Sequence, residues 1–566
     1  MAILPATLNC KAYLFSRDKT PDDQGNIMTT IAQPEIATQR RVINYFTNTL
    51  DYQYLGNLHD NPTTPNIDDH RLRAWLTSQG HDELTITRAL DNLTRANAIT
   101  ATRDLYDTNR AVYELLRYGV KVKPTVGEKS ITVPLIDWQT PTANHFAIAE
   151  EVTVKGATQT RRPDVVLYIN GIAVAVLELK RSTVALSEGI RQHLSSQSKD
   201  FIPHFYTTVQ LVLAGNDSEG LRYGVIQTPE KYFLEWKEPD PEPNPLLRAL
   251  GQLCRPERLL EIIHDFMVFD AGIKKTCRHN QYFGVRAAQP HIQRREGGII
   301  WHTQGSGKSL TMVWLAKWIR EQSAEHRVLL ITDRTELDEQ IEKVFLGVDE
   351  QIYRTSSSAD LIHTLNSDTE WLICTLVHKF ARGGEDTATE DFIQELQQHL
   401  PPNFRARGNI TVFVDECHRT QSGKLHRAMK TLLPDAIFIG FIGTPLLKTD
   451  KQTSVETFGG WIHQYKYDQA VRDGVVLDLR YEARDIDQTL ESPELVDQWF
   501  AAKTQGLSDL GKAELKKRWG TMQKLLSAAD RLRKIVADIL MDMAQRDRLR
   551  SGRRERRWPW TKRSVP

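Results

Sequence analysis

The sequence is poor in cysteine, has almost no excess of charge of either sign, and contains no long apolar run. Its five cysteines follow neither a metal-binding nor a disulfide spacing, as expected in a reducing compartment. No apolar stretch approaches the roughly 20 residues that a membrane-spanning helix needs, and the N-terminus lacks the pattern of a secretion signal. These absences predict a cytoplasmic protein with no membrane partner.

The charge balance also limits how the chain can bind nucleic acid. The 566 residues include 73 basic and 72 acidic side chains, which give a net charge of +1. Any DNA binding must therefore come from local patches rather than from bulk charge. The length leaves room for several domains with sizeable cores.

One segment has the pattern of a β-hairpin that begins at a carboxylate. Asp164 precedes the apolar run 165–169, Asn170-Gly171 is typical of a tight turn, and 172–179 continues as a largely apolar strand. Side chains alternate along a strand, so Glu178 and Lys180 share one face. If the hairpin folds as Asn-Gly predicts, two carboxylates and one ammonium group converge.

That set of groups is what phosphodiester hydrolysis requires, namely carboxylates that hold Mg²⁺ and a lysine beside the attacking water. An ordinary hairpin with exposed charges is the alternative interpretation. The stretch resembles the PD-(D/E)xK nuclease superfamily at Pro163, Asp164, Glu178 and Lys180. The resemblance implies that Asp164 and Glu178 are metal ligands and that Lys180 orients or activates the water.

Some members of that superfamily add a Gln-x-x-x-Tyr helix after the lysine. Gln192 is well placed for its glutamine, and the resemblance makes it a further catalytic candidate, but position 196 is Ser rather than Tyr.

A second cluster of motifs has the pattern of a phosphate-binding loop. The apolar strand 297–302 leads into a glycine-rich loop and then into the helical run 310–319. Backbone N–H groups of such a loop wrap phosphates, and the helix N-terminus adds a favourable dipole. His302 stands where a strict Walker pattern has Gly. The predicted ATP-binding residues are Gln304, Gly305, Ser306, Gly307, Lys308, which reaches the β and γ phosphates, and Ser309, which holds Mg²⁺.

Two further strands end in residues that complete this site. The run 409–414 ends at Asp415-Glu416, where Asp415 is predicted to hold Mg²⁺ and Glu416 to act as the catalytic base. The run 436–442 is closed by Gly443-Thr444-Pro445, which makes Thr444 a cofactor-binding candidate. In this order the motifs resemble motifs I, II and III of superfamily 2 helicases, and 328–340 resembles their motif Ia.

Both clusters together resemble the restriction (motor and nuclease) subunit of type I restriction-modification enzymes. The similarity includes the stretches 216–224, 301–304 and 333–338. It implies an ATP-dependent translocase and endonuclease that acts on double-stranded DNA beside separate methyltransferase and specificity subunits. In relatives a glutamine upstream of the P-loop strand reads the adenine, so Gln281 is a candidate for that role.

Superfamily 2 motors need two RecA-like lobes, because ATP lies between them. Only about 120 residues follow Thr444, so we expect a C-terminally truncated subunit. The residues 546–557 hold seven arginines, and an out-of-frame tail or a DNA-binding arm are both open interpretations. Two alternative functions stay open: a non-catalytic remnant that binds partner subunits, and a metal-dependent nuclease that needs no ATP.

The expected fold class is multidomain α/β: a PD-(D/E)xK nuclease-like domain followed by one RecA-like superfamily 2 lobe and part of a second. The domain boundaries follow from breaks in pattern. They are 1–27, an N-terminal extension of uncertain role; 28–237, a helical segment and the nuclease domain; 238–245, a proline-rich linker; 246–465, the first lobe; and 466–566, the incomplete second lobe with a basic tail.

Overall fold

The computed structural model describes most residues between Glu35 and Gln545. The described ranges are 35–61, 64–123, 129–332, 351–376, 404–417, 432–443, 458–478, 504–519 and 529–545, with a few isolated residues between them. The extension 1–27 and the arginine-rich tail lie outside the described residues. The chain divides into two compact units, Met1–Leu477 and Asp478–Pro566, and each is described by itself.

The first unit opens with a helical segment, as the sequence predicts. Its helices are α1 (Glu35–Asn48), α2 (Asp69–Ser78), α3 (Glu83–Ala96) and α4 (Leu105–Tyr118). An aspartate caps each of the last three, because Asp68, Asp82 and Asp104 each accept a hydrogen bond from a backbone N–H of the first turn. These helices bury their apolar faces against a six-stranded sheet.

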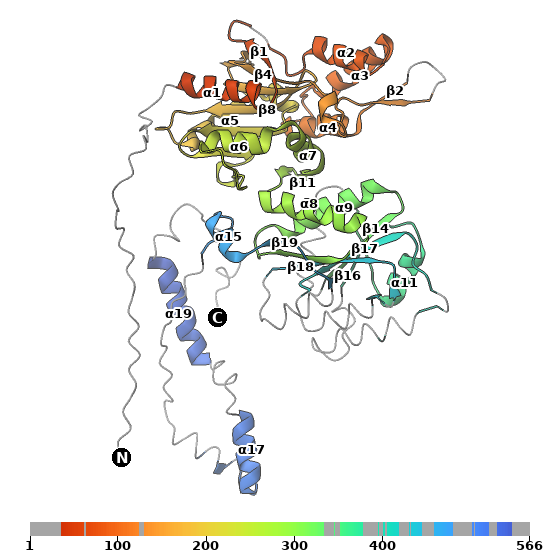
Figure 1. Ribbon diagram of the computed structural model, residues 1–566. Helices are drawn as coiled ribbons and strands as arrows, with labels where there is room; N and C mark the ends of the chain where they lie inside the picture. Colours follow the sequence, from red (N-terminus) through yellow and green to blue (C-terminus); the bar gives the residue numbers. More distant parts are fainter. Residues whose placement is uncertain are drawn as a thin grey trace. The chain divides into compact units, whose positions relative to one another are not determined.

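That sheet runs in the order β1-β4-β7-β8-β9-β10 and is mixed (Figure 1). Its strands are β1 (Gln53–Asn57), β4 (Phe146–Glu150), β7 (Val165–Ile169), β8 (Ile172–Leu179), β9 (Leu211–Asn216) and β10 (Gly220–Gly224). Two short pairs lie beside it: β2 (Val120–Val122) with β3 (Ile131–Val133), and β5 (Val154–Lys155) with β6 (Thr160–Arg161). We call residues 35–236 the sheet domain.

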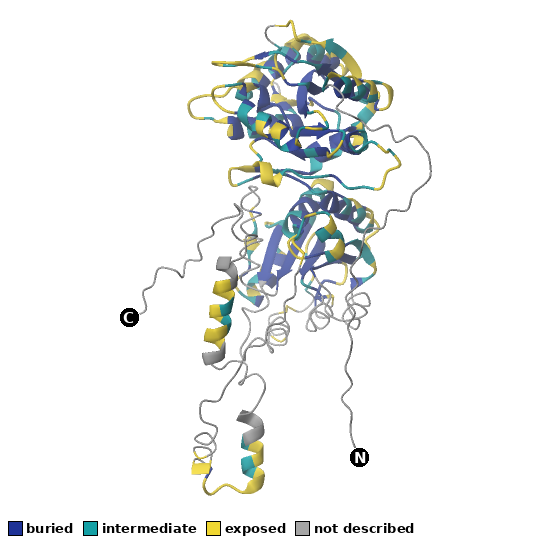
Figure 2. Ribbon diagram, turned by 90° about the vertical axis from the view of Figure 1, so that its left-hand side faces the viewer, coloured by how far each residue is buried: buried dark blue, intermediate teal, exposed yellow. Residues whose placement is uncertain are grey.

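The predicted hairpin is confirmed in detail. Strands β7 and β8 pair antiparallel, and Asn170 and Gly171 both have positive φ (52° and 87°), as a two-residue turn of this kind requires. The register is interrupted between Leu167 and Tyr168, which marks a bulge. All eight residues of β8 are buried, so its apolar residues pack on both faces of the sheet. In Figure 2 buried residues fill the middle of the sheet domain, in the upper part of the view.

One helix and three short 3₁₀ turns complete the sheet domain. They are α5 (Leu186–Ser196), η1 (Pro141–Ala143), η2 (Pro203–Thr207) and η3 (Glu230–Tyr232). α5 packs on β8 and β9, and a Cβ at Gly189 would make ordinary contacts with Ala214 (3.4 Å) and Glu178 (3.7 Å), which places this turn of the helix directly over the two strands.

The proline-rich segment 238–245 is tied to its neighbours rather than standing free as a spacer. Glu238 forms ion pairs with Arg258 (3.0 Å) and Arg255 (3.8 Å), and its carbonyl accepts a hydrogen bond from Gln252. Asn244 caps the next helix through the backbone N–H groups of Leu246 and Leu247. Glu238 and Asn244 therefore attach the two ends of this segment to α6 and α7.

The following segment is helical only in part. It contains α6 (Pro245–Cys254), α7 (Pro256–Asp265), the antiparallel pair β11 (Met267–Asp270) and β12 (Ile273–Thr276), and α8 (His279–Gln293). The β11–β12 hairpin interrupts the helices of this segment. Its turn is Ala271-Gly272, both with positive φ (46° and 87°), and Ala gives a weaker turn signal than Asn.

The remaining strands of the first unit form one parallel sheet in the order β15-β16-β14-β17-β18-β13-β19. They are β13 (Gly298–His302), β14 (His326–Thr332), β15 (Tyr353–Arg354), β16 (Leu372–Leu376), β17 (Asn409–Asp415), β18 (Ile437–Ile442) and β19 (Trp461–Tyr465). Its helices are α9 (Lys308–Gln322), α11 (Ser358–Asn366) and α15 (Tyr467–Arg472). α8 and α9 lie side by side over its strands (Figure 1). We call residues 245–477 the P-loop domain.

The first compact unit ends at Leu477, whereas we predicted the end of the first lobe at 465. The reason is that β19 pairs with β13 and that the Tyr465 hydroxyl donates to Asp473 (2.8 Å), which holds α15 on this sheet. In the second unit the described helices are α17 (Asp509–Trp519) and α19 (Ala529–Gln545). No described helix is long and apolar enough to span a bilayer.

Candidate nuclease and nucleotide sites

Asp164 and Glu178 meet at the open end of the hairpin. The pairing of Val165 with Leu177 brings the two carboxyl groups close enough to interact electrostatically. The second oxygen of Asp164 accepts from the backbone N–H of Leu179 (2.7 Å). Glu178 is 1% exposed, and its Oε2 atom makes no hydrogen bond with any described residue. The predicted convergence of these two carboxyl groups is therefore present.

Lys180 lies at the same place. Its Nζ atom is 3.9 Å from Glu178 Oε2 and 3.3 Å from Glu35 Oε1, and it donates to the Leu179 carbonyl (2.9 Å). Glu35 begins α1, so a third carboxylate reaches the cluster from a helix more than a hundred residues upstream. Sequence reasoning missed Glu35, because no motif links it to the hairpin.

Burial raises the pKa values of both buried carboxyl groups. Removal from water is the largest cause, and it lifts the pKa of Asp164 to about 6 and that of Glu178 well above its usual range. The neighbouring Asp164 carboxylate is the next cause of the raised pKa of Glu178, so the pair favours the protonated form when no cation is bound. Such a pair has a strong tendency to exchange its proton for a cation, so these residues fit a divalent metal ion.

This pairing predicts a pH-dependent metal affinity. We expect Mn²⁺ to bind more tightly as the pH rises from about 5 to 7, because fewer protons then compete for Asp164 and Glu178. Without metal, the free energy of unfolding should fall over the same interval, because the folded state binds more protons than the unfolded state. Mn²⁺ titrations at several pH values test this, with Asp164→Asn as the control. An affinity independent of pH would contradict this competition between protons and metal.

Gln192 makes no hydrogen bond or ion pair with Asp164, Glu178 or Lys180 among the described residues. It lies half-buried on α5. Its neighbour His193 is fully buried, donates from Nε2 to the Leu213 carbonyl (2.7 Å) and meets the Tyr206 hydroxyl at Nδ1 (3.2 Å). Burial lowers the pKa of His193 to about 4, so the ring is neutral.

Tyr206 is a tyrosine that lies beside α5. Its hydroxyl meets His193 Nδ1 (3.2 Å), and burial, followed by the nearby Glu178 carboxylate, raises its pKa well above the usual range. Tyr206 belongs to η2, not to α5, so no Gln-x-x-x-Tyr spacing links it to Gln192.

The phosphate-binding loop has the predicted conformation. Gly305 and Gly307 have positive φ (82° and 93°), and Gly307 is the residue before α9. The helix therefore begins at Lys308 with free backbone N–H groups, as an anion site requires. Ser306 is buried and donates to the Thr303 carbonyl (2.5 Å), which closes the turn, whereas Gln304 is exposed and Ser309 half-buried.

His302 shows how the loop departs from the strict Walker pattern. Its imidazole points away from the loop and meets His463 on β19 (2.9 Å between Nε2 and Nδ1). A Cβ on Gly284 of α8 would come within 2.7 Å of this ring. The bulky residue is accommodated because α8 carries glycine opposite it.

The acidic pair lies across from the loop. Asp415 ends β17 and is 4% exposed, while Glu416 has φ +49° and its carboxylate lies 3.5 Å from Lys308 Nζ. One strand, β18, separates β17 from β13. A Cβ on Gly443, which follows β18, would meet Lys308 Nζ at 2.9 Å, so this glycine leaves room for the lysine.

Gln281 contacts the loop directly. Its side-chain amide donates to the Gly307 carbonyl (2.9 Å) and accepts from the backbone N–H of Arg278 (2.8 Å). It thus lies at the mouth of the loop. Thr444 and the motif Ia residues 333–340 lie outside the described residues.

Two protein families match parts of this chain. Residues 32–231 match the type I restriction enzyme R protein N terminus family, and residues 280–513 match the SWI2/SNF2 ATPase family. A putative type I restriction enzyme MjaIXP endonuclease subunit from Methanocaldococcus jannaschii is 29% identical over 471 residues, which are 76% of this chain and 44% of that protein.

The type I restriction enzyme HindI endonuclease subunit from Haemophilus influenzae is 29% identical over 499 residues, which are 81% of this chain and 46% of that protein. Among solved structures, the SWI2/SNF2 ATPase core of Sulfolobus solfataricus in complex with dsDNA overlays with a TM-score of 0.25 at 14% identity, covering 45% of this chain and 44% of that one.

The chain is therefore similar to the N terminus of type I restriction enzyme R proteins in its first part, and to curated endonuclease subunits of such enzymes over most of its length. Most of its P-loop domain matches the SWI2/SNF2 ATPase family, which implies ATP use. The chain spans less than half the length of the two curated relatives described above.

Proposed function

We propose that this chain is the ATP-dependent DNA translocase and endonuclease subunit of a type I restriction-modification complex, which cleaves unmodified double-stranded DNA. The observation that carries the proposal is that a buried carboxylate–lysine cluster and a phosphate-binding loop occur in one compact unit. Methyltransferase and specificity subunits are the proposed partners, and the cytoplasm is the proposed location.

At the sheet domain we propose a PD-(D/E)xK nuclease centre. Asp164 and Glu178 would hold Mg²⁺, which supplies charge neutralisation at the scissile phosphate. Lys180 lies where it can orient a water molecule, because Glu178 and Glu35 hold its ammonium group in place. Gln192 is a candidate for positioning substrate from α5. These proposed roles rest on the distances between Lys180 and the carboxyl groups of Glu178 and Glu35.

At the P-loop domain the proposed roles follow the order of the motifs. The loop from Gln304 to Gly307 would wrap the phosphates, Lys308 would contact the β and γ phosphates, and Ser309 with Asp415 would hold Mg²⁺. Glu416 would accept the proton of the attacking water. Gln281 is proposed to read the adenine, and Thr444 to complete the site.

The direct test is DNA-stimulated ATP hydrolysis by the chain reconstituted with its methyltransferase and specificity subunits. Asp415→Asn serves as the blank. Hydrolysis above the blank, together with cleavage of unmodified DNA, supports the proposal. Partner binding with turnover equal to the blank would replace it with the non-catalytic function, and Mg²⁺-dependent nicking without ATP would replace it with the autonomous nuclease.

The contact between Lys180 and Glu35 leads to a prediction for cleavage. Replacing Glu35 by Gln removes the charge that holds Lys180 from the α1 side. We expect the Mg²⁺ concentration for half-maximal cleavage to rise by about 10-fold, as for other groups that orient a metal-site residue. A metal titration of DNA cleavage measures this.

Glu83→Gln is the matched control, because Glu83 also begins a helix and pairs with an arginine, Arg73. If both variants behave like the unmodified chain, Glu35 has no part in the centre.

A further inference from the structure

Helix α4 carries a polar stripe of three residues, Asn109, Tyr113 and Arg117. They are spaced four residues apart, so they lie on one side of the helix. All three are buried (0%, 5% and 6% exposed). Buried polar groups in such a row need partners, and here the partners come from three different parts of the first unit.

Asn109 holds the backbone beside the proposed nuclease centre. Its side-chain amide donates to the carbonyls of Tyr206 (3.1 Å), Thr207 (3.0 Å) and Val209 (2.9 Å). Tyr206 is the residue whose hydroxyl lies against His193 and near Glu178. One end of the stripe therefore fixes the turn that carries Tyr206.

Tyr113 connects the middle of the stripe to the P-loop domain. Its hydroxyl donates to the His264 carbonyl on α7 (3.2 Å) and accepts from Arg117 (3.5 Å). Beneath it the buried Lys274 of β12 donates to Asn109 Oδ1 (2.8 Å) and to Gln210, with its ammonium 5.6 Å from the Tyr113 ring centre. Sheet domain and P-loop domain thus share one hydrogen-bonded network.

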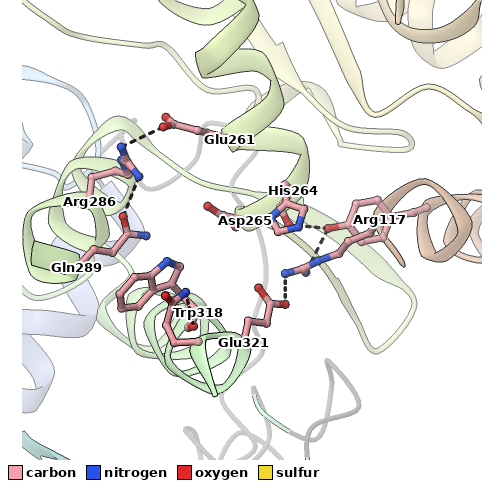
Figure 3. Close-up of polar contacts among 10 residues, drawn as sticks. Arg117, Glu261, His264, Asp265, Arg286, Gln289, Trp318 and Glu321 are labelled. Carbon is pink, nitrogen blue, oxygen red and sulfur yellow. Dashed lines mark hydrogen bonds and ion pairs between the residues drawn. The ribbon is translucent and has the colours of Figure 1, made fainter. Parts of the chain in front are cut away.

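Arg117 forms the other end of the stripe. Its guanidinium is ion-paired with Glu321, in the last turn of α9, and Figure 3 shows this contact beside His264 and Asp265. The Arg117 side chain is 3% exposed and that of Glu321 is 31% exposed, so the pair joins a buried arginine to a carboxylate that faces solvent. α9 is the helix that begins at Lys308, and its 15 residues span about 22 Å.

The surroundings of this ion pair are open. A cavity of 580 Å³ adjoins it, lined from the sheet domain by Trp75 and Trp138 and from α9 by Trp318 and Glu321. This cavity leaves room for the end of α9 that carries Glu321 to shift relative to α4. His264, Asp265 and Glu321 also lie close enough to hold a metal ion, but the Arg117 guanidinium already supplies positive charge there.

We propose that α4 couples the nucleotide site to the nuclease centre, through the Arg117–Glu321 ion pair at one end and the Asn109 contacts at the other. In the structure Lys308 is paired with Glu416, and phosphates that attract Lys308 compete with this pair; the proposed response is a shift of α9, which begins at Lys308. The far end of α9 carries Glu321, which transmits the shift to Arg117 and α4. The inference rests on the proposed function of both sites.

Backbone hydrogen exchange of the full chain tests this coupling at constant Mg²⁺, with and without ADP. We expect ADP to slow exchange in 203–210 by about fivefold or more, the lower range of coupling between sites. Glu321→Gln should abolish this response while mant-ADP fluorescence shows unchanged nucleotide binding. Arg117→Gln breaks the same pair from the buried side and should have the same effect.

Arg110→Gln is the matched control, because Arg110 also lies on α4 and pairs with a carboxylate, Glu114, but at an exposed position of the same helix. It should respond like the unmodified chain. A response in Glu321→Gln equal to that of the unmodified chain overturns the proposed link. So does an unmodified chain that binds mant-ADP without any change in 203–210. A chain that does not bind mant-ADP overturns the proposed ATPase function instead.

Discussion

Replacing Lys308 by alanine is expected to reduce DNA-stimulated ATP turnover by about 100- to 1,000-fold, the range for removing one preorganised group that stabilises transition-state charge. Lys308 is the only side chain at the start of α9 with a positive charge, and Gly443 leaves room for its ammonium group. The measurement is steady-state phosphate release in the reconstituted complex. Nucleotide affinity should fall as well, because the contact with the phosphates exists in the bound state too.

The Lys308→Ala variant must stay folded for this result to be informative. The change also removes the ion pair between Lys308 and Glu416. Because Asp164 and Glu178 belong to the sheet domain, we expect Mn²⁺ binding there to persist, and this binding reports an intact sheet domain. Turnover close to that of the unmodified chain would remove the loop from the proposed mechanism.

The second large effect concerns DNA cleavage. Glu178→Gln should lower the cleavage rate by about 100- to 1,000-fold, because the amide cannot supply the negative charge that holds the metal ion. ATP turnover should be unchanged, since Glu178 belongs to the sheet domain. A supercoiled-plasmid cleavage assay run beside phosphate release measures both in one reaction.

Stability separates this loss from misfolding. The pKa of Glu178 is raised by burial, so an uncharged amide of nearly equal size removes an unfavourable buried group. Without metal, the thermal midpoint of Glu178→Gln should equal or exceed that of the unmodified chain. Cleavage at the unmodified rate would contradict the assignment of the nuclease centre.

The sequence predicted those parts of the fold that depend on local signals. Asn170-Gly171 determined the hairpin, and the alternation along β8 placed Glu178 and Lys180 together. The loop from Gly305 to Gly307 could be predicted for the same reason, since glycines there provide the left-handed backbone.

Groups that meet across long stretches of chain could not be predicted. Glu35 and Tyr206 reach the carboxylate cluster from other elements, and no spacing rule connects them to it. The Arg117–Glu321 pair joins residues 204 positions apart. Such contacts follow from tertiary packing, which a single sequence does not reveal. The roles of all these residues stay predictions until the variants are measured.

The turn of the β7–β8 hairpin is also a docking point for the helical segment. The Gly171 carbonyl accepts from the backbone N–H of Asp68, and a Cβ on Gly171 would lie 2.9 Å from Arg71 Cβ. The side chain of Asn170 is buried and donates to the carbonyl of Leu135. The smallest fragment that can fold around Asp164 and Glu178 therefore has to include α2, and an isolated strand pair would expose the very turn that sets its register.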